Sequence, residues 1–319
     1  MLRIGYRDHA NAARLAARHL QLRDAPHLIR VANAAVYQCG PYALRVTLDA
    51  NHTLPRLHRL LAQGGLAVPT VFGTLPFGGL HVTVLEWIDA DPSAEPDWFG
   101  TGQQVRALHY LTPGDLGDIT APHWFNSRLD KARTRLRSVR GARLPERAAV
   151  VIESHLKQVA AAQAREQSRP FSVLHADLHS GNLLQSRAGP RVLDLDSVSI
   201  GPALWDHGAL LLEERHFAAP RAPYESFASG YGANYRDHPS LEPAIVLGAL
   251  ACTLWVHTLA PTEQVLAQQR VRTAYWANGD TTPWAGIGCP PGPTSPPAGQ
   301  TDSQLGAPAG GLPPQRAGR

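Results

Sequence analysis

Residues 171–206 read FSVLHADLHSGNLLQSRAGPRVLDLDSVSIGPALWD, and the rest of the chain is organised around them. The apolar run 171–174 predicts a strand that leads into Asp177. A glycine lets the backbone turn tightly before Asn182, and a second short strand after the next turn ends on Asp194. Two short strands therefore present a carboxylate, a carboxamide and a second carboxylate from their ends and from the loop between them.

This set of side chains fits phosphoryl transfer, which needs an acid to accept a hydroxyl proton and oxygen donors for a metal ion. The order His-x-Asp-x-x-x-x-Asn, followed twelve residues later by an Asp that closes an apolar strand, resembles the catalytic core of protein-kinase-like folds. No Asp-Phe-Gly or Ala-Pro-Glu follows it. The details are instead similar to the aminoglycoside phosphotransferase (phosphotransferase enzyme) family. The matching segments are His175-Ala176-Asp177-Leu178-His179, Asp194-Leu195-Asp196, Gly201-Pro202 and Trp205-Asp206.

The resemblance implies roles for three residues of this stretch. Asp177 would be the catalytic base, and Asn182 and Asp194 would hold Mg²⁺ beside ATP. A competing interpretation is a metallohydrolase, because His175, Asp177 and His179 alternate like a metal clip. Asn182 argues against that class, since a carboxamide is a poor zinc ligand. By itself His179 is expected to be a solvated loop residue. Asp206 is expected to cap the helix that follows it.

The charge of the chain does not indicate nucleic-acid binding. The net charge is +4 and the pI is about 9.1. Only Lys131 and Lys157 are lysines among the 30 basic residues, and the arginines are spread along the chain without a dense run. This distribution favours a bias in composition over a binding surface.

Other features of composition favour a cytoplasmic protein outside the membrane. The three cysteines are far apart, so no disulfide framework is predicted. The N-terminus has no apolar signal core, and Ala12, Leu15, Ala16 and Leu20 predict a packed first helix. The segment Ala244–Ala260 carries no formal charge, but it is shorter than the ~20 residues that a membrane span needs. We interpret it as a buried helix.

The region before residue 86 predicts a small lobe of strands. Strands are expected at Leu28–Val31, Ala35–Gln38 and Tyr42–Val46, with a helix at 53–64. In the resembling fold the third strand carries a cation that binds phosphate, and here the only candidate is Arg45. The first hairpin lacks a glycine-rich pattern, and the segment 51–63 has no acidic residue to pair with that cation. These two departures leave open a catalytically weak nucleotide-binding protein.

The strand His81–Leu85 leads into what the resemblance implies is the hinge between two lobes. Backbone groups of Glu86 and Ile88 would bind adenine there. The helix that follows, 102–111, contains His109, which is expected to be structural.

After the catalytic stretch, further helices are expected near 209–214, 224–231, 241–259 and 262–276. The resemblance implies that they build the acceptor site. Its candidate acids are Glu213, Glu214, Glu225 and Asp237. Residues 277–319 are rich in Pro and Gly and are expected to form a disordered tail. Within this tail, Trp284 can fold back onto the body of the protein.

Together these observations predict an α+β, two-lobed, protein-kinase-like fold. Residues 1–86 would form the nucleotide-covering lobe and 87–276 the helical catalytic and acceptor lobe. The expected activity is ATP- and magnesium-dependent phosphorylation of a hydroxyl group on a small molecule, either an antibiotic or a metabolite. The sequence does not fix the acceptor or the oligomeric state.

Overall fold

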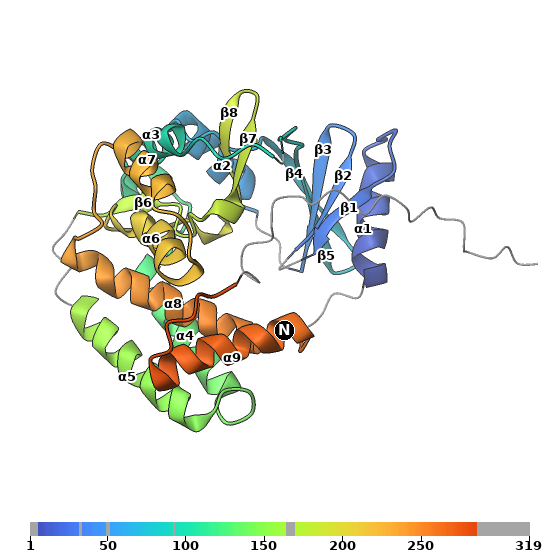
Figure 1. The fold of residues 1–319 in the computed structure, drawn as a ribbon. Coiled ribbons are helices and arrows are strands. Elements are labelled where there is room, and N and C mark those ends of the chain that lie inside the picture. The colour runs from blue at the N-terminus through green and yellow to red at the C-terminus, as the bar shows by residue number, and fades with distance from the viewer. Residues whose placement is uncertain (1–5, 32–33, 49–51, 92, 164–169, 286–319) are drawn as a thin grey trace, which may run out of the picture.

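The chain folds into two lobes, a β-sheet with one helix and a larger group of helices (Figure 1). The computed structural model describes residues 6–31, 34–48, 52–91, 93–163 and 170–285. Within them the buried apolar side chains form two separate core clusters, one in each lobe. The predicted α+β, two-lobed architecture is confirmed.

A five-stranded antiparallel sheet forms the first lobe, in the order β1-β2-β3-β5-β4. The side chains of β2 alternate between buried and half-buried, which is the period expected when one face packs on a core. The edge strand β4 contains a glycine and a proline and was not expected from the sequence, because both residues weaken the strand pattern. The strands are β1 His27–Val31, β2 Ala35–Cys39, β3 Tyr42–Thr47, β4 Val71–Phe77 and β5 Leu80–Glu86.

Helix α1, Tyr6–His19, covers one face of this sheet (Figure 1). Its buried apolar residues are four alanines: Ala12, Ala13, Ala16 and Ala17. Small side chains let the helix lie close to the strands. The prediction that Leu15 and Leu20 belong to the packed face is wrong, since these side chains are 49% and 36% exposed.

Helix α2, Leu54–Gln63, precedes β4 in the chain but packs with the helical lobe. Leu57 and Leu61 belong to the core cluster of that lobe, together with Leu108 of helix α3. The segment after α2 is also bound to the helical lobe, because the Ala67 amide donates to the Gln104 side chain and the Ala67 carbonyl accepts from the Val192 amide. The sheet core therefore contains no residue of α2.

Helix α8, Glu242–Thr258, lies inside the helical lobe and packs against four other helices. The segment Pro239–Thr258 is apolar and long enough to cross a membrane, yet 67% of its most apolar window is buried within the protein. This agrees with a core helix. The other α-helices of the lobe are α3 Trp98–His109, α4 Trp124–Val139, α5 Glu146–Gln163, α6 Trp205–Phe217, α7 Ala222–Tyr231 and α9 Glu263–Asn278.

Two small hairpin-like pairs hold the stretch 171–206. Strand β6, Ser172–Leu174, pairs with β9, Ser199–Gly201, and β7, Leu183–Ser186, pairs with β8, Gly189–Val192. The loop between β6 and β7 and the loop between β8 and β9 therefore emerge side by side. Short 3₁₀ helices punctuate the lobe: η1 Pro113–Leu116, η2 Ser180–Asn182, η3 Leu195–Ser197 and η4 Pro239–Leu241.

The described chain ends with a segment that returns to the helical lobe after α9. Trp284 is 2% exposed, its backbone N–H donates to the His216 carbonyl at 2.6 Å, and its ring stacks on the His216 ring with centroids 4.5 Å apart. The fold-back of Trp284 is thus observed. Most of the predicted tail, 286–319, lies outside the described residues.

Candidate active site

Asp177 lies in a loop whose backbone is strained. The preceding residue, Ala176, has φ +70°, and Asp194 in the neighbouring loop has φ +59°. Residues other than glycine rarely adopt this left-handed conformation, and it persists only where the surroundings hold it in place. The two positions are the residue before the predicted base and a predicted metal ligand, so the strain coincides with the predicted chemistry.

A fully buried carboxylate holds the loop in this conformation. Asp206 accepts hydrogen bonds from the backbone amides of His175 and Ala176, both at 2.7 Å, and from His109 Nε2 at 3.1 Å. Burial works to raise the pKa of Asp206, but these donors keep its pKa below the ordinary value. The prediction that Asp206 caps α6 is wrong, because Leu204 is the N-cap residue and Asp206 lies inside the first turn.

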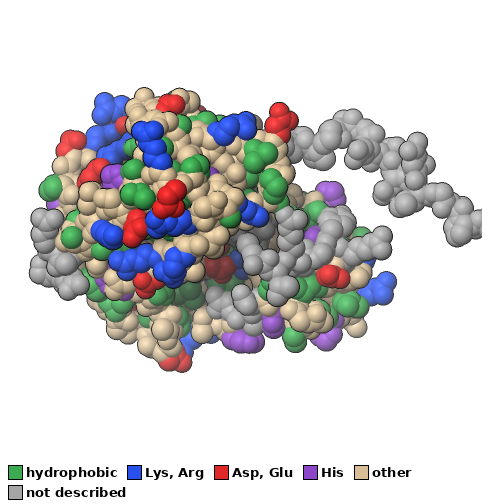
Figure 2. Space-filling view, turned by 90° about the horizontal axis from the view of Figure 1, so that it is seen from below, with side chains coloured by type: hydrophobic (Ala, Val, Ile, Leu, Met, Phe, Trp, Pro, Cys, Tyr) green, Lys and Arg blue, Asp and Glu red, His purple; other side chains and the backbone are tan. Residues whose placement is uncertain are grey.

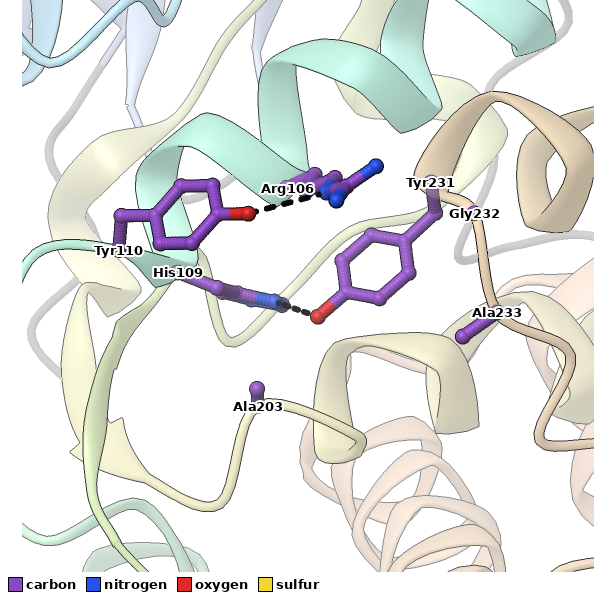
Figure 3. Close-up of a pocket in the computed structure, with 7 residues that line it drawn as sticks. All are labelled: Arg106, His109, Tyr110, Ala203, Tyr231, Gly232 and Ala233. Atoms are coloured by element: carbon purple, nitrogen blue, oxygen red, sulfur yellow. Dashed lines mark hydrogen bonds between the residues drawn. The ribbon is translucent and has the colours of Figure 1, made fainter.

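The ring of His109 connects Asp206 to helix α7. The Tyr231 hydroxyl lies 2.9 Å from His109 Nδ1, at a place where α3 and α7 cross closely. Gly102 and Gly230 permit this approach, since a Cβ on either would meet the backbone of the other helix within about 2 Å. Figure 3 shows His109 and the Tyr231 hydroxyl joined by this hydrogen bond. Both residues line a cavity of about 220 Å³. The structural role expected for His109 is thus to position Asp206.

The carboxylate of Asp177 faces helix α4. Arg128 Nη2 donates to Asp177 Oδ1 at 2.8 Å and also to the Ala176 carbonyl, while Trp124 Nε1 donates to the same carbonyl at 3.1 Å. His179 Nε2 lies 3.8 Å from Asp177 Oδ2, so His179 is more than a solvated loop residue. Burial works to raise the pKa of Asp177, but the charges of Arg128 and His179 bring its pKa below the ordinary value.

Asn182 and Asp194 supply the oxygen atoms that a magnesium ion prefers. The carboxamide nitrogen of Asn182 donates to the backbone carbonyl of Asp177 at 2.9 Å, and the Leu193 amide donates to the backbone carbonyl of Asn182 at 2.8 Å. These bonds bring the two loops together and leave the carboxamide oxygen available as a ligand. Burial, together with the charges of Asp196 and Asp177, raises the pKa of Asp194. A nearby cation would relieve that crowding, so the residues fit Mg²⁺, which needs only one or two protein oxygens besides phosphate.

The cation on β3 is held by an acid from the catalytic stretch. Arg45 donates to the Asp196 carboxylate and lies 3.9 Å from that of Asp194. The sequence led us to look for this partner on α2, where none exists. Asp196, in η3, supplies the charge instead. The charges of Asp196 and Arg45 act on the pKa of His58 of α2, but His58 Nδ1 is directed to the Pro69 carbonyl.

At the predicted hinge, some backbone N–H groups already donate hydrogen bonds within the protein. The Glu86 amide donates to the Thr70 carbonyl at 2.8 Å and the Trp87 amide donates to that of Pro41 at 2.9 Å. Ile88 is buried, and its amide donates to no backbone carbonyl within the described ranges. Within the described ranges, the Glu86 N–H group is therefore used by another backbone group, and the Ile88 N–H group is not.

The histidines that the metallohydrolase interpretation needs as metal ligands form hydrogen bonds within the protein. His175 Nε2 donates to the Leu193 carbonyl at 2.8 Å, and its Nδ1 accepts from the Asp177 amide at 3.3 Å, so both ring nitrogens are used. The Nδ1 atom of His179 accepts from the Gly181 amide. Across the described part of the chain, no three His, Cys, Asp or Glu side chains are grouped to hold a metal.

Two of the acids predicted for an acceptor site are engaged within the protein. Glu213 accepts from the amide and hydroxyl of Ser180, at 3.2 and 2.8 Å, and so braces the catalytic loop. Glu214 pairs with Arg221 and Arg236. On the face drawn in Figure 2, Lys and Arg side chains are interspersed with Asp and Glu side chains.

Comparison with known proteins places this geometry in context. Residues 39–244 match the model of the phosphotransferase enzyme family. No curated protein sequence matches significantly. Among solved structures, a choline/ethanolamine kinase family protein from Mesorhizobium loti superposes with a TM-score of 0.63 at 19% identity, covering 85% of this chain and 95% of that one. A microcompartment-associated aminopropanol kinase also gives 0.63 at 19% identity, covering 82% and 94%. An amicoumacin kinase solved in complex with AMP-PNP, Ca²⁺ and Ami gives 0.62 at 14% identity, covering 85% and 95%.

Proposed function

Since this chain belongs to the phosphotransferase enzyme family, we propose that it uses ATP and Mg²⁺ to phosphorylate a hydroxyl group of a small molecule in the cytoplasm. The family and the kinases of similar structure support the class of reaction, which is phosphoryl transfer to an alcohol group. The nucleotide, the metal and the residue roles below are the proposal's own.

In this proposal the nucleotide lies between the sheet and the stretch 171–206. Arg45 binds phosphate, and backbone groups of Glu86 and Ile88 bind adenine. Asn182 and Asp194 hold Mg²⁺, which when bound offsets the negative charge of the phosphates. Arg45 leaves Asp196 for the phosphates when nucleotide enters, because a guanidinium can pair bidentately with either.

The transfer step uses Asp177. The acceptor hydroxyl oxygen forms a bond to the γ-phosphorus, the bond from that phosphorus to the bridging oxygen of ADP breaks, and the hydroxyl proton moves to the Asp177 carboxylate. Arg128 and the bond network of Asp206 hold this carboxylate in position. Positioning is expected to supply much of the rate, since phosphoryl transfer leaves little covalent chemistry to the protein.

One observation carries the proposal more than any other: the Asn182 side chain donates to the Asp177 carbonyl and the Leu193 amide donates to the Asn182 carbonyl, so the loops of Asp177, Asn182 and Asp194 meet. The surroundings also displace the pKa values of the two neighbouring carboxylates in opposite directions, downward for Asp177 and upward for Asp194. A pair of acids separated in this way indicates different roles. Asp177, paired with Arg128, stays ionised and can accept a proton. Asp194, crowded by other acids, favours a bound cation.

The test compares Asp177→Asn with Asp194→Asn. Asp177→Asn should lower turnover by about 10² or more, the usual scale for loss of a general base, while affinity for ATP with Mg²⁺ stays within a few-fold. Asp194→Asn should weaken magnesium-dependent ATP binding itself, because Asp194 would hold the metal that offsets the charge of the phosphates. Titration calorimetry and ADP release measure the two effects.

Other outcomes separate the alternatives. A parent that binds ATP with Mg²⁺ but releases no ADP with any acceptor would be a nucleotide-binding protein without turnover. A parent with no ATP affinity, whose variants both lose a tightly bound transition metal, would contradict the kinase function and favour a metallohydrolase.

A further inference from the structure

Tyr231, the last residue of helix α7, directs its hydroxyl group at a histidine of another helix. The hydroxyl lies 2.9 Å from His109 Nδ1 on α3, and it makes no other hydrogen bond within the described part of the chain. The Tyr231 ring packs against the rings of His207 and Phe227. A phenylalanine would serve that packing equally well. The hydroxyl group is therefore the feature of Tyr231 that packing does not explain.

Two glycines bring α7 close enough to α3 for this bond. A Cβ at Gly102 of α3 would lie 2.1 Å from the Phe227 carbonyl oxygen. A Cβ at Gly230 of α7 would lie 1.9 Å from the carbonyl oxygen of Phe99. Only glycine fits at such contacts, although glycine weakens the interior of a helix. The sequence thus accepts weaker helices at two positions, and the close crossing places the hydroxyl of α7 against the ring on α3.

The positions of the protons follow from the two ends of this contact. His109 Nε2 lies 3.1 Å from the fully buried Asp206 carboxylate, which can only accept, so Nε2 carries a proton. Burial raises the pKa of Tyr231, so its hydroxyl keeps its proton and can donate it to Nδ1. A doubly protonated ring would leave the Tyr231 proton without an acceptor among the described residues. The donors and acceptors therefore match when His109 is neutral and bonded at both nitrogens.

The bonds continue from His109 to the proposed base. Asp206 accepts from the His175 and Ala176 amides, both at 2.7 Å, and Ala176 directly precedes Asp177. Ala176 has φ +70°, a conformation that persists only where the surroundings hold it. Hydrogen bonds in series thus connect α7 to the strained backbone beside the base.

The cavity next to this contact limits how much the hydroxyl can contribute. Tyr231 and His109 both line the cavity of about 220 Å³. A water molecule in this space could take the place of the hydroxyl group at Nδ1, but it would not tie the ring to α7. Loss of the hydroxyl should therefore loosen the loop without unfolding it.

We infer that Tyr231 is a positioning residue of the proposed phosphotransfer: its hydroxyl group holds the His109 ring, and through Asp206 this ring holds the backbone that precedes Asp177. The inference rests on the proposed function for its effect on turnover. Because Tyr231 acts through other residues, its loss should affect turnover and leave ATP binding unchanged.

The first test is Tyr231→Phe, which removes the hydroxyl group and keeps the ring. ADP release is measured with ATP, Mg²⁺ and the fastest acceptor from a panel of sugars, amino alcohols and hydroxy acids. The kcat should fall about 10-fold with the KM for ATP unchanged, as for loss of one hydrogen bond. Tyr110→Phe is the matched control, because the Tyr110 hydroxyl lines the same cavity but accepts from Arg106. An unchanged kcat in Tyr231→Phe would overturn the inference.

A double-mutant cycle separates this role from packing. His109→Leu removes both ring nitrogens, so adding Tyr231→Phe to it should change kcat by less than about 2-fold. If the two reductions in kcat multiply instead, Tyr231 acts independently of His109 and the inference is wrong.

Nuclear magnetic resonance tests the bonds without turnover. Nitrogen-15 spectra of histidine-labelled protein report which ring nitrogen carries the proton, and the spectrum of His109→Leu identifies the signals of this ring. The parent and Tyr110→Phe should show a neutral ring with its proton on Nε2. In Tyr231→Phe the Nδ1 signal should lose the shift that the hydroxyl bond causes. A doubly protonated ring in the parent would overturn the inference.

Hydrogen exchange shows whether the effect reaches the loop. In Tyr231→Phe the His175 and Ala176 amides should exchange about 10-fold faster relative to amides of the core helix α8, which report global stability. Unchanged exchange of these two amides would contradict the inference. A parent that releases no ADP with any acceptor would contradict the proposed phosphotransfer, while the exchange rates would still decide whether Tyr231 holds the loop.

Discussion

Asp206 organises the candidate site from a fully buried position. Three donors converge on its buried carboxylate, and two of them are the backbone amides that precede Asp177. The residue thereby pins the strained Ala176 and fixes the direction in which Asp177 leaves the loop. Its role follows from hydrogen bonds between segments about thirty residues apart in the chain.

We expect Asp206→Asn to lower the free energy of unfolding by about 3 kcal/mol, because an amide nitrogen would face a buried donor and leave it unsatisfied. Turnover should also fall by about 10-fold or more, since the base is no longer held in position. Urea denaturation and ADP release measure the two quantities. Asp8→Asn is the control, as Asp8 is exposed on α1 and has no role in the candidate site. Normal turnover in a destabilised Asp206→Asn would show that the bonds serve stability alone.

Among single residues, the sequence could point to those that lie close together in one motif. Asp177, Asn182 and Asp194 belong to one short motif, and the structure brings their loops together. Asp196, Arg128 and Asp206 were given no such role, because their partners lie far along the chain: Arg45 pairs with Asp196 across 151 positions. Nothing in the local pattern of α4 distinguishes Arg128 from the other arginines of that helix.

The acid that pairs with the strand cation Arg45 comes from η3 and not from helix α2. Helix α2 has no acidic side chain, so the strand cation is held by η3, which follows the proposed metal ligand directly. The cation and the metal ligand are thus connected through one short segment of chain. In a fold that keeps the acid on a separate helix, the two would move independently.

Loss of this cation should affect nucleotide binding. Arg45→Ala should raise the KM for ATP about 10-fold and lower turnover, because charge-assisted contacts to phosphate disappear. Arg45→Lys should restore only part of the affinity, since the ammonium lacks the planar fork. Arg59→Ala, which removes one exposed positive charge from α2, is the matched control. Kinetics unchanged in Arg45→Ala would contradict a role for Arg45 at the phosphates.

The type of each long helix and of most strands could be predicted from periodicity, but two elements could not be described correctly. Strand β4 contains Gly73 and Pro76, which conceal its pattern. In α1 the predicted packed face combined Ala12 and Ala16 with Leu15 and Leu20, while the structure buries the alanines and exposes the leucines. In both cases packing between elements outweighs the local signal.

For the whole molecule, the segment after α9 closes the helical lobe. Trp284 stacks on His216, and the Arg272 guanidinium lies 5.0 Å from the centre of its ring. Burial lowers the pKa of His216 to about 4, so this ring stays neutral under its aromatic cover near neutral pH. The lobe therefore extends past the end of its last helix.

Two truncations test this boundary. Removal of residues 289–319 should leave the melting temperature nearly unchanged, because a segment rich in Pro and Gly has little apolar surface to bury. Truncation after Gly279, or the substitution Trp284→Ala, should lower the melting temperature by about 5 °C, as expected for loss of a buried aromatic side chain. Differential scanning calorimetry compares the three proteins. Equal melting temperatures for all of them would show that Trp284 contributes nothing.

The position of α2 has a consequence for the order in which the newly made chain can fold. Ribosomes release the sheet lobe first, and its core is complete once β5 has emerged. Helix α2 emerges before β5, yet Leu57 and Leu61 find their partners only when α3 and later segments follow. A helix of ten residues is marginal alone. During synthesis the side chains of Leu57 and Leu61 therefore lack their partners from α3 although the sheet is already finished.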